Sequence, residues 1–460
     1  MGVMEFIDEA AGIVGSRWIR TKEWELYAYS RDYWPYLVYK DIRGEKPRLP
    51  AAVILPGNEE EVTRIVDAAS EHGVPILVYA GGSGVLGGAV PDEGWIILDL
   101  SRLDWIEWYD EESGIIDVGA GVFLKDLETW LNSKGMTLRH FPQSYPEAMV
   151  GGLVATRSVG QYSTGYGGIE DMVLGLHVVV PRYGLVRVKP SPRRSVLIPL
   201  EELFIGSEGL YGVITRVYLR ALDLPEYSLL VGWRSGFFEE ALDEARLLTR
   251  RRIVPELFRV YNEAETMVHF KQEGSVSIGV IEGSHNVVEA RRHAIEELIG
   301  RDVLECVECT RDWLEKRFNV INDIYNLYKT GMGFETIEVS IHWGRVKEFY
   351  RESLKELGDI PGVVFTGVHA SHFYHAGVAL YYTFAFDLTR FEEAYNGIWS
   401  RLMNTVSRFD GSISHHHGVG RMRLRYLEKE YGSKGVSLLG GIKQAMDPGG
   451  VLRDKVLGDY

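Results

Sequence analysis

From Pro50 onward, apolar and polar residues alternate in the two periods that distinguish strands from helices. Short apolar runs, bounded by glycine, proline or polar residues, predict strands at 51–56, 74–82, 95–101, 115–121, 174–181 and 211–222. The helical period predicts helices at 58–73 and 123–135, and the first of these has acids in its first turn and ends at Gly73. The first half of the chain therefore predicts βαβ units.

The pattern changes after Leu224 and Pro225. Long charged helices, predicted at 236–252 and 286–300, alternate with strands such as 274–283 and 379–388. The last segment predicts a helix that is followed by a Pro-Gly turn and a tail. We therefore expect a first domain at 1–223, a second at 224–425, and a tail at 426–460 that returns to the first.

Charge and hydropathy narrow the class of protein. The 460 residues carry a formal net charge of −15, which argues against non-specific nucleic-acid binding and allows at most peripheral membrane contact. The N-terminus has no signal pattern, and no window is apolar enough to span a bilayer. We expect a cytoplasmic protein with a small-molecule substrate.

Three glycine-rich segments lie at junctions with predicted strands, at 79–90, 150–173 and 206–215. Glycine lets successive backbone N–H groups approach a pyrophosphate that a side chain would obstruct. The first segment matches neither the dinucleotide fingerprint nor the P-loop. Three such segments in one α/β half predict that the backbone wraps around an extended ligand.

The order of these motifs resembles the FAD-binding domain of the vanillyl-alcohol oxidase and p-cresol methylhydroxylase flavoproteins. The stretches that carry the resemblance include "YAGGSGVLGG", "GGLVATRSVG", "IED" and "GSEGLYGVIT", and the core of the likeness covers 46–224. The resemblance implies an α+β protein. Its FAD-binding domain would consist of two α/β subdomains, and its α+β cap domain would be built on an antiparallel sheet.

The same resemblance implies FAD and the residues that contact it. The pyrophosphate would lie on the loop formed by Ala80, Gly81, Gly82, Ser83, Gly84 and Val85. The isoalloxazine would lie near Pro142, Ser144, Gly151, Gly152, Ala155 and Thr156, and adenine and ribose near Glu170, Asp171 and Ile214. Some covalent flavoproteins have a histidine in the glycine loop. This loop has none, so we expect non-covalent FAD.

The second half resembles alkyldihydroxyacetonephosphate synthase (alkylglycerone-phosphate synthase) and its bacterial and archaeal relatives, through "SISHHHGVGRMR" and "VALYYTFAF". That family exchanges an acyl group on dihydroxyacetone phosphate for an alcohol through flavin N5. The resemblance implies that Tyr381 is the acid/base group and that Arg259 binds the substrate anion. It also places His415, His416, His417 and His140 in the active site. Removing a proton next to a carbonyl requires a poised base and donors for the oxyanion.

Several departures from that family keep other functions open. A second active-site arginine of the family has no match, although Arg317 or Lys329 could replace it, and His369, His372 and His375 are additional. One alternative is an FAD-dependent dehydrogenase of a D-2-hydroxy acid or glycerol phosphate. A second is a catalytically degenerate flavin-binding module.

A metal site is the remaining question raised by the histidines. If 412–417 is a strand, His415 and His417 share one face and His416 points to the other, so at most two neighbours could bind one ion. We therefore predict a flavoenzyme without a metal. We also expect a homodimer, which is common in this family.

Overall fold

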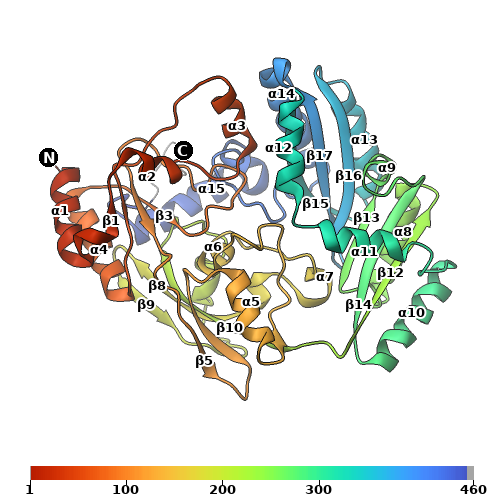
Figure 1. Cartoon of the computed structure of the whole chain (residues 1–460), viewed down its shortest axis with the longest axis horizontal. Helices are drawn as coiled ribbons and strands as arrows, with labels where there is room; N and C mark the ends of the chain where they lie inside the picture. Colours follow the sequence, from red (N-terminus) through yellow and green to blue (C-terminus); the bar gives the residue numbers. More distant parts are fainter. Residues whose placement is uncertain (1, 453–460) are drawn as a thin grey trace.

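The computed structural model describes residues 2–452, without the side chains of 320–323. The proposed tail at 426–460 is thus described only as far as residue 452. Two parts lie side by side in Figure 1: the N-terminal half with α15 on the left, and the segment from β12 to α14 on the right. Among the described residues, no helix combines the length and apolar character needed to cross a bilayer.

A small sheet in the N-terminal half has the order β1-β2-β4-β3, in which β2, β4 and β3 are parallel. Its strands and adjacent helices are β1 (Ile19–Arg20), β2 (Ala52–Ile54), β3 (Ile76–Tyr79), β4 (Ile96–Asp99), α1 (Gly2–Val14) and α4 (Glu59–His72). The helix predicted at 58–73 is confirmed as α4. The side chain of Asn58 accepts the N–H of Glu61, and Gly73 ends the helix at φ 64°.

A five-stranded antiparallel sheet with the order β5-β6-β10-β8-β9 completes this half. Its strands are β5 (Ile106–Asp110), β6 (Ile115–Gly119), β8 (Val173–Val180), β9 (Gly184–Val188) and β10 (Val213–Arg220). The apolar core of this sheet includes residues of α5 (Leu124–Asn132), α6 (Val150–Ala155) and the C-terminal α15 (Leu427–Met446). A two-stranded sheet, β7 (Met136–Thr137) with β11 (Leu222–Asp223), lies beside it.

The third sheet has six antiparallel strands in the order β12-β14-β13-β16-β17-β15, and we call it the cap sheet. Its strands are β12 (Tyr227–Ser235), β13 (Leu257–Tyr261), β14 (Ser275–Gly283), β15 (Met332–His342), β16 (Val363–Phe373) and β17 (Gly377–Asp387). One face packs on α8 (Phe238–Arg250), α10 (His285–Ile299), α13 (Val346–Gly358) and α14 (Phe391–Arg408).

The other face of the cap sheet is turned toward the N-terminal half. The short helix α7 (Ser163–Tyr166) contacts β13 and β16, while α9 (Glu263–Phe270), α11 (Val307–Lys316) and α12 (Val320–Lys329) lie against β16, β12 and β15. In Figure 1, α12 and α13 lie on opposite sides of β15–β17. The remaining elements are α2 (Glu23–Ala28), α3 (Pro35–Ile42) and five short 3-10 turns at 16–18, 169–171, 200–203, 388–390 and 424–426.

The apolar layer between the cap sheet and α14 supplies the first prediction. Leu402 on α14 is 0% exposed, whereas Leu438 on α15 is 66% exposed. Leu402→Ala leaves a cavity that should cost about 2–5 kcal/mol, and Leu438→Ala should be nearly neutral. Thermal unfolding of the holoprotein, followed by tryptophan fluorescence, checks this. Equal shifts of the unfolding temperature in the two variants would show that this apolar layer does not stabilise the fold.

Candidate active site

Four side chains form a row across the N-terminally facing side of the cap sheet. Tyr261 pairs with His369, His369 with Tyr381, and Tyr381 with Glu338, on strands β13, β16, β17 and β15. Directly opposed residues of antiparallel strands point to the same face, so these four side chains are neighbours. The next row along, Val260–Ala370–Leu380–Val339, points the other way into the apolar core. We call the first set the polar row.

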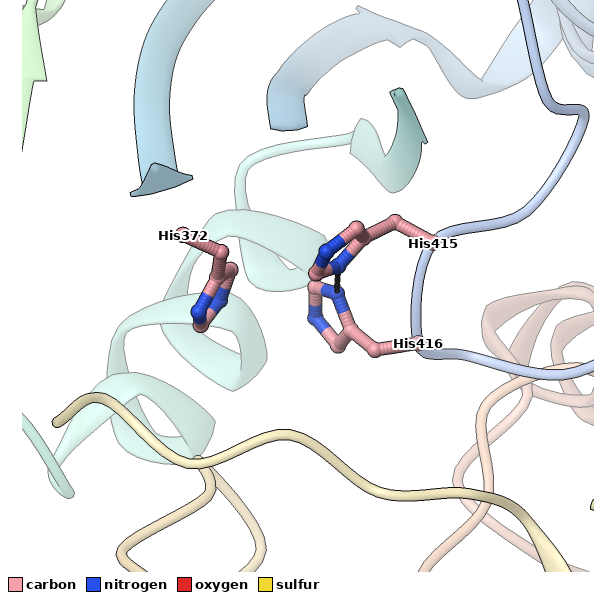
Figure 2. Close-up of side chains that lie close together, drawn as sticks. All are labelled: His372, His415 and His416. Carbon is pink, nitrogen blue, oxygen red and sulfur yellow. Dashed lines mark hydrogen bonds between the residues drawn. The ribbon is translucent and has the colours of Figure 1, made fainter. Parts of the chain in front are cut away.

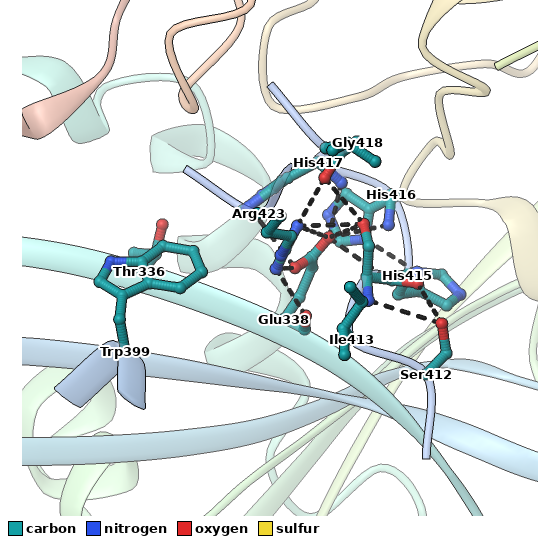
Figure 3. Close-up of polar contacts among 12 residues, drawn as sticks. Thr336, Glu338, Trp399, Ser412, Ile413, His415, His416, His417, Gly418 and Arg423 are labelled. Carbon is teal, nitrogen blue, oxygen red and sulfur yellow. Dashed lines mark hydrogen bonds and ion pairs between the residues drawn. The ribbon is translucent and has the colours of Figure 1, made fainter. Parts of the chain in front are cut away.

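Glu338 is completely buried at one end of the polar row and holds the histidine segment in place. Its Oε1 accepts the backbone N–H groups of His415, His416 and His417 at 3.2, 2.9 and 2.6 Å (Figure 3). Successive N–H groups that converge on one anion form a nest. The loop is therefore folded around a carboxylate that belongs to another strand.

Arg423 neutralises this carboxylate from the other side. Its guanidinium donates to both oxygens of Glu338 and to the carbonyl oxygen of Gly418, and both ionic side chains are 0% exposed. Burial alone would raise the pKa of Glu338, but the charge of Arg423 and its hydrogen bonds hold that pKa well below its usual value. The result is a buried, fully ionised pair.

Residues 412–417 do not form a strand beyond one bridge between Ser340 and Ser412. The nest on Glu338 curls the backbone, so the adjacent His415 and His416 approach each other, with 2.8 Å between their Nδ1 atoms. Burial lowers the pKa of His415 to about 4 and lowers the pKa values of His416 and His417, although the charge of Glu338 opposes each shift. All three imidazoles are neutral near pH 7.

His372 joins this group from β16. A register shift between Ser371 and Phe373 and a φ of 55° at His372 turn its side chain toward the loop. The ring stacks on His415 at 4.9 Å (Figure 2). Its Nδ1 lies 2.6 Å from the hydroxyl of Ser163. One nitrogen from each of His372, His415 and His416 lies within 4.8 Å of the others, which is close enough to hold a metal ion. The absence of a metal remains a prediction.

Tyr381 lies between two imidazoles. Its ring centroid is 4.8 Å from that of His369 on one strand and 6.1 Å from that of His416, and both pairs are nearly parallel. The ring of His417 meets it edge-on at 5.5 Å. Burial raises the pKa of Tyr381 to about 12, although a hydrogen bond from Thr336 opposes the shift. The phenol is thus protonated at neutral pH.

Arg259 lies on the same face, whereas His140 does not belong to the cluster. Arg259 donates to the hydroxyl of Tyr261 at 3.1 Å and lies 4.9 Å from the centre of the Trp313 ring. His140 is fully buried in the N-terminal half, with its Nε2 3.3 Å from the hydroxyl of Ser158. Burial lowers its pKa to about 3. Among the described contacts, none joins His140 to Tyr381, so a direct role of His140 in proton transfer stays a prediction.

The glycine loop after β3 has the free donors that a pyrophosphate needs. Within residues 2–452, the N–H groups of Gly81, Gly82, Ser83 and Gly84 donate no hydrogen bond to another protein group. Gly82 has a φ of 60°, and a Cβ on Gly81 would come within 2.1 Å of the carbonyl oxygen of Glu147. The loop is shaped for close backbone approach to an anion.

Unsatisfied buried groups also occur on Glu170, a predicted flavin contact, and on Gln161 and His140, which were not predicted to contact the flavin. The side-chain oxygen and nitrogen of Gln161, Nδ1 of His140 and Oε2 of Glu170 are buried without a partner. Gly151 and Gly152 lie on α6, where a Cβ on Gly151 would clash with Ala120. The remaining predicted contacts stay predictions: Ala80, Val85, Pro142, Ser144, Ala155, Thr156, Asp171 and Ile214. The donor set fits a dinucleotide flavin.

Sequence reasoning missed Glu338, Arg423 and Glu265. Glu265 on α9 is 1% exposed and accepts Nδ1–H of His369 at 2.8 Å. A partial signal was present, because "FETIEVSIH" places Thr336, Glu338 and Ser340 at period 2, which predicts a polar face of a strand. Their partners are distant in the chain and could not be identified from spacing.

A glycine-lined cofactor fold beneath an antiparallel cap sheet, with ionisable groups on the facing side, defines an FAD-dependent oxidoreductase-type flavoenzyme. The family described as "FAD binding domain" matches residues 50–188, and "FAD linked oxidases, C-terminal domain" matches 224–455. The chain belongs to the FAD-linked oxidase family, and FAD is its cofactor.

Curated relatives cover most of the chain. The uncharacterised FAD-linked oxidoreductase YgcU of Escherichia coli (strain K12) is 31% identical, over 97% of this chain and 96% of its own length. Alkyldihydroxyacetonephosphate synthase of Trypanosoma brucei brucei is 29% identical, over 89% and 74%. D-lactate dehydrogenase of Archaeoglobus fulgidus is 25% identical, over 87% and 91%.

Solved structures confirm the predicted fold class. A structure of alkyldihydroxyacetonephosphate synthase has a TM-score of 0.81 at 21% identity and covers 97% of this chain and 84% of its own. p-Cresol methylhydroxylase with substrate bound has a TM-score of 0.79 at 16% identity and covers 98% and 95%. The α+β architecture, with its cofactor domain and antiparallel cap sheet, is that of p-cresol methylhydroxylase-type flavoproteins.

The buried ion pair supplies the second prediction. Glu338→Gln leaves Arg423 buried without a counter-charge and should lower the free energy of unfolding by about 3–5 kcal/mol. Its matched control is Glu393→Gln, which breaks the exposed pair with Arg390 and should cause no measurable change. Chemical denaturation of both holoproteins gives the comparison.

The pH dependence of the same experiment has a definite sign. Because the folded pKa of Glu338 lies below that of an unfolded glutamate, about 4.3, its contribution is complete above that value. It is lost as the pH falls through the lower folded pKa. Wild type should therefore lose more stability than Glu338→Gln on acidification below about pH 4.3. Parallel curves would contradict a charged Glu338.

Proposed function

We propose that this protein is a non-covalent FAD enzyme that moves a proton at a carbon beside the carbonyl or hydroxyl of a small phosphate- or carboxylate-bearing compound. The reaction class is that of alkyldihydroxyacetonephosphate synthase. The observation that carries the proposal is the position of Tyr381 between His369 of the polar row and His416 of the histidine loop. The ring centroids of these two histidines lie 4.8 and 6.1 Å from that of Tyr381. A homodimer and a cytoplasmic location are further proposals that rest on the resemblance alone.

The residues of the polar row suit proton transfer. A phenol with a pKa near 12 stays protonated at neutral pH and can donate a hydrogen bond to a developing oxyanion. The neutral imidazoles of His416 and His417 lie beside it and can accept or donate further hydrogen bonds to the substrate. FAD, when bound, supplies the redox-active and electrophilic ring against which the substrate is held.

Arg259 supports an anionic substrate. Its guanidinium lies on the same sheet face as Tyr381, and its planar fork is matched to phosphate or carboxylate. Alkyldihydroxyacetonephosphate synthase and D-lactate dehydrogenase, both relatives of this chain, are named after anionic compounds. A phosphate or carboxylate is therefore the group that we assign to this arginine.

A dehydrogenase of a D-2-hydroxy acid or glycerol phosphate is the second candidate. It is favoured by the group formed by His372, His415 and His416, because three neutral imidazoles can bind a divalent metal. A flavin-binding module without activity is the third candidate.

The third prediction separates these candidates. The purified protein should be yellow, and acid should release its flavin. Anaerobic mixing with D-lactate or glycerol 3-phosphate should leave the flavin oxidised if the exchange reaction is correct. In that case acyl-dihydroxyacetone phosphate with a long-chain alcohol should release fatty acid. Bleaching would instead establish the dehydrogenase, and a colourless protein would remove the basis of the proposal.

The fourth prediction concerns Tyr381. Tyr381→Phe removes one hydroxyl and should lower turnover by at least about a hundredfold while FAD stays bound. His416→Ala should behave in the same way.

Tyr382→Phe is the matched control for Tyr381→Phe. Tyr382 follows Tyr381 on β17 but points into the core, where its hydroxyl lies 2.7 Å from that of Ser353. Its turnover should be unchanged. Turnover and flavin content are measured on the same samples. Loss of flavin from Tyr381→Phe would show that Tyr381 serves flavin binding, which contradicts the proton-transfer role assigned to it.

A further inference from the structure

We propose that Arg259, Ser371 and His369 form a subsite for a small anion that carries a hydroxyl group close to its phosphate or carboxylate. The proposal rests on the function proposed above and applies to its hydroxyl-bearing substrates, because acyl-dihydroxyacetone phosphate has no free hydroxyl to donate. The three residues are adjacent on one face of the cap sheet, because Arg259 pairs with Ser371, and His369 lies two residues before Ser371 on β16. Arg259 binds the anion, and the other two recognise the hydroxyl.

Two buried atoms at this place have no hydrogen-bond partner in the described chain. They are Oγ of Ser371 and Nε2 of His369, in residues that are 2% and 6% exposed. An unsatisfied buried polar atom destabilises a folded protein, and native structures contain few of them. Two such atoms side by side on the face that also carries Tyr381 indicate groups that a ligand completes.

Glu265 determines which kind of ligand atom His369 can meet. The Glu265 carboxylate lies 2.8 Å from Nδ1 of His369 and can only accept, so Nδ1 carries the proton and Nε2 offers a lone pair. The rings of Tyr261 and Tyr381 lie on either side of the imidazole at 5.1 and 4.8 Å and fix its plane. Nε2 therefore requires a donor, which a hydroxyl supplies and a keto oxygen does not.

Arg259 is available for an anion. Among the described residues, no carboxylate forms an ion pair with it, and one of its five N–H groups is used on the hydroxyl of Tyr261. Trp313 lies against the guanidinium at 4.9 Å and orients its plane. An arginine fork beside a hydroxyl acceptor matches a hydroxy acid or a hydroxyalkyl phosphate, and it discriminates against the deoxy compound.

The test measures binding without turnover, in Tyr381→Phe holoenzyme. The probes are D-lactate against propionate and glycerol 3-phosphate against propyl phosphate, titrated by the change in flavin absorbance. The hydroxylated member of at least one pair should bind about tenfold more tightly. Adding His369→Phe or Ser371→Ala should remove that preference, and adding Arg259→Met should weaken both members about tenfold or more.

Ser340→Ala is the matched control. Ser340 lies on the same face, two strands away from Ser371, through the pairs with Ala379. In the Tyr381→Phe background it should leave the preference intact. A preference that persists in His369→Phe would overturn the proposal, as would a failure of all four anions to perturb the flavin. Failure of the proposed function is seen separately, as turnover that survives in Tyr381→Phe.

A second measurement applies if His369→Phe does not fold. In wild-type holoenzyme with 15N-labelled histidine, the Nε2 resonance of His369 should be that of an unprotonated nitrogen. It should move when the hydroxylated probe is added and stay in place with its deoxy counterpart. An Nε2 that already carries a proton, or that ignores both probes, would contradict the subsite.

Discussion

The buried pair between Glu338 and Arg423 is the interaction on which the candidate site depends. Glu338 belongs to the cap sheet. Arg423, and the three backbone N–H groups that donate to the Glu338 carboxylate, belong to the segment that leads to α15. Removing two charges from water is costly, and only complete hydrogen bonding offsets the cost. The geometry of the histidine loop is therefore set by the need to satisfy one carboxylate.

A second carboxylate holds the same loop from the cofactor side. Glu208, in the glycine-rich segment before β10, accepts the N–H groups of Val419 and Gly420 (2.5 Å and 3.3 Å). The loop is thus fixed at one end to the cap sheet and at the other to the flavin-binding half. This arrangement places the imidazoles of His416 and His417 beside Tyr381, at the junction where both halves contribute.

Along the strands of the cap sheet, successive side chains point alternately to the two faces of the sheet. Even-numbered residues of β15 such as Thr336, Glu338 and Ser340 face the flavin-binding half, while Ile337 and Val339 fill the core. The pattern breaks at His372, where a bulge turns one more imidazole to the functional side. One sheet therefore supplies both the stability of the cap and a surface of ionisable groups.

Local patterns were sufficient to predict much of this architecture. The helix at 58–73 and strands of the first half follow from capping residues and apolar runs whose signals lie within short windows, whereas the FAD fold was implied by the family resemblance of the glycine-rich motifs. Tyr381 and the histidines were identified by resemblance, and their spatial proximity agrees with it.

The conformation of 412–417 could not be predicted, because Glu338 lies more than seventy residues away in the chain. The bulge at His372 and the pair between Glu265 and His369 likewise depend on contacts between distant segments. Such contacts leave no periodic trace in the sequence. Residues that act through them were therefore the ones that sequence reasoning missed.

The decisive experiment is a crystal structure of the protein with FAD bound at neutral pH. We expect the isoalloxazine to face the polar row, with the hydroxyl of Tyr381 and the ring of His416 on the same side of the flavin. An isoalloxazine that lies away from the cap sheet, or that is separated from Tyr381 by other side chains, would contradict this expectation.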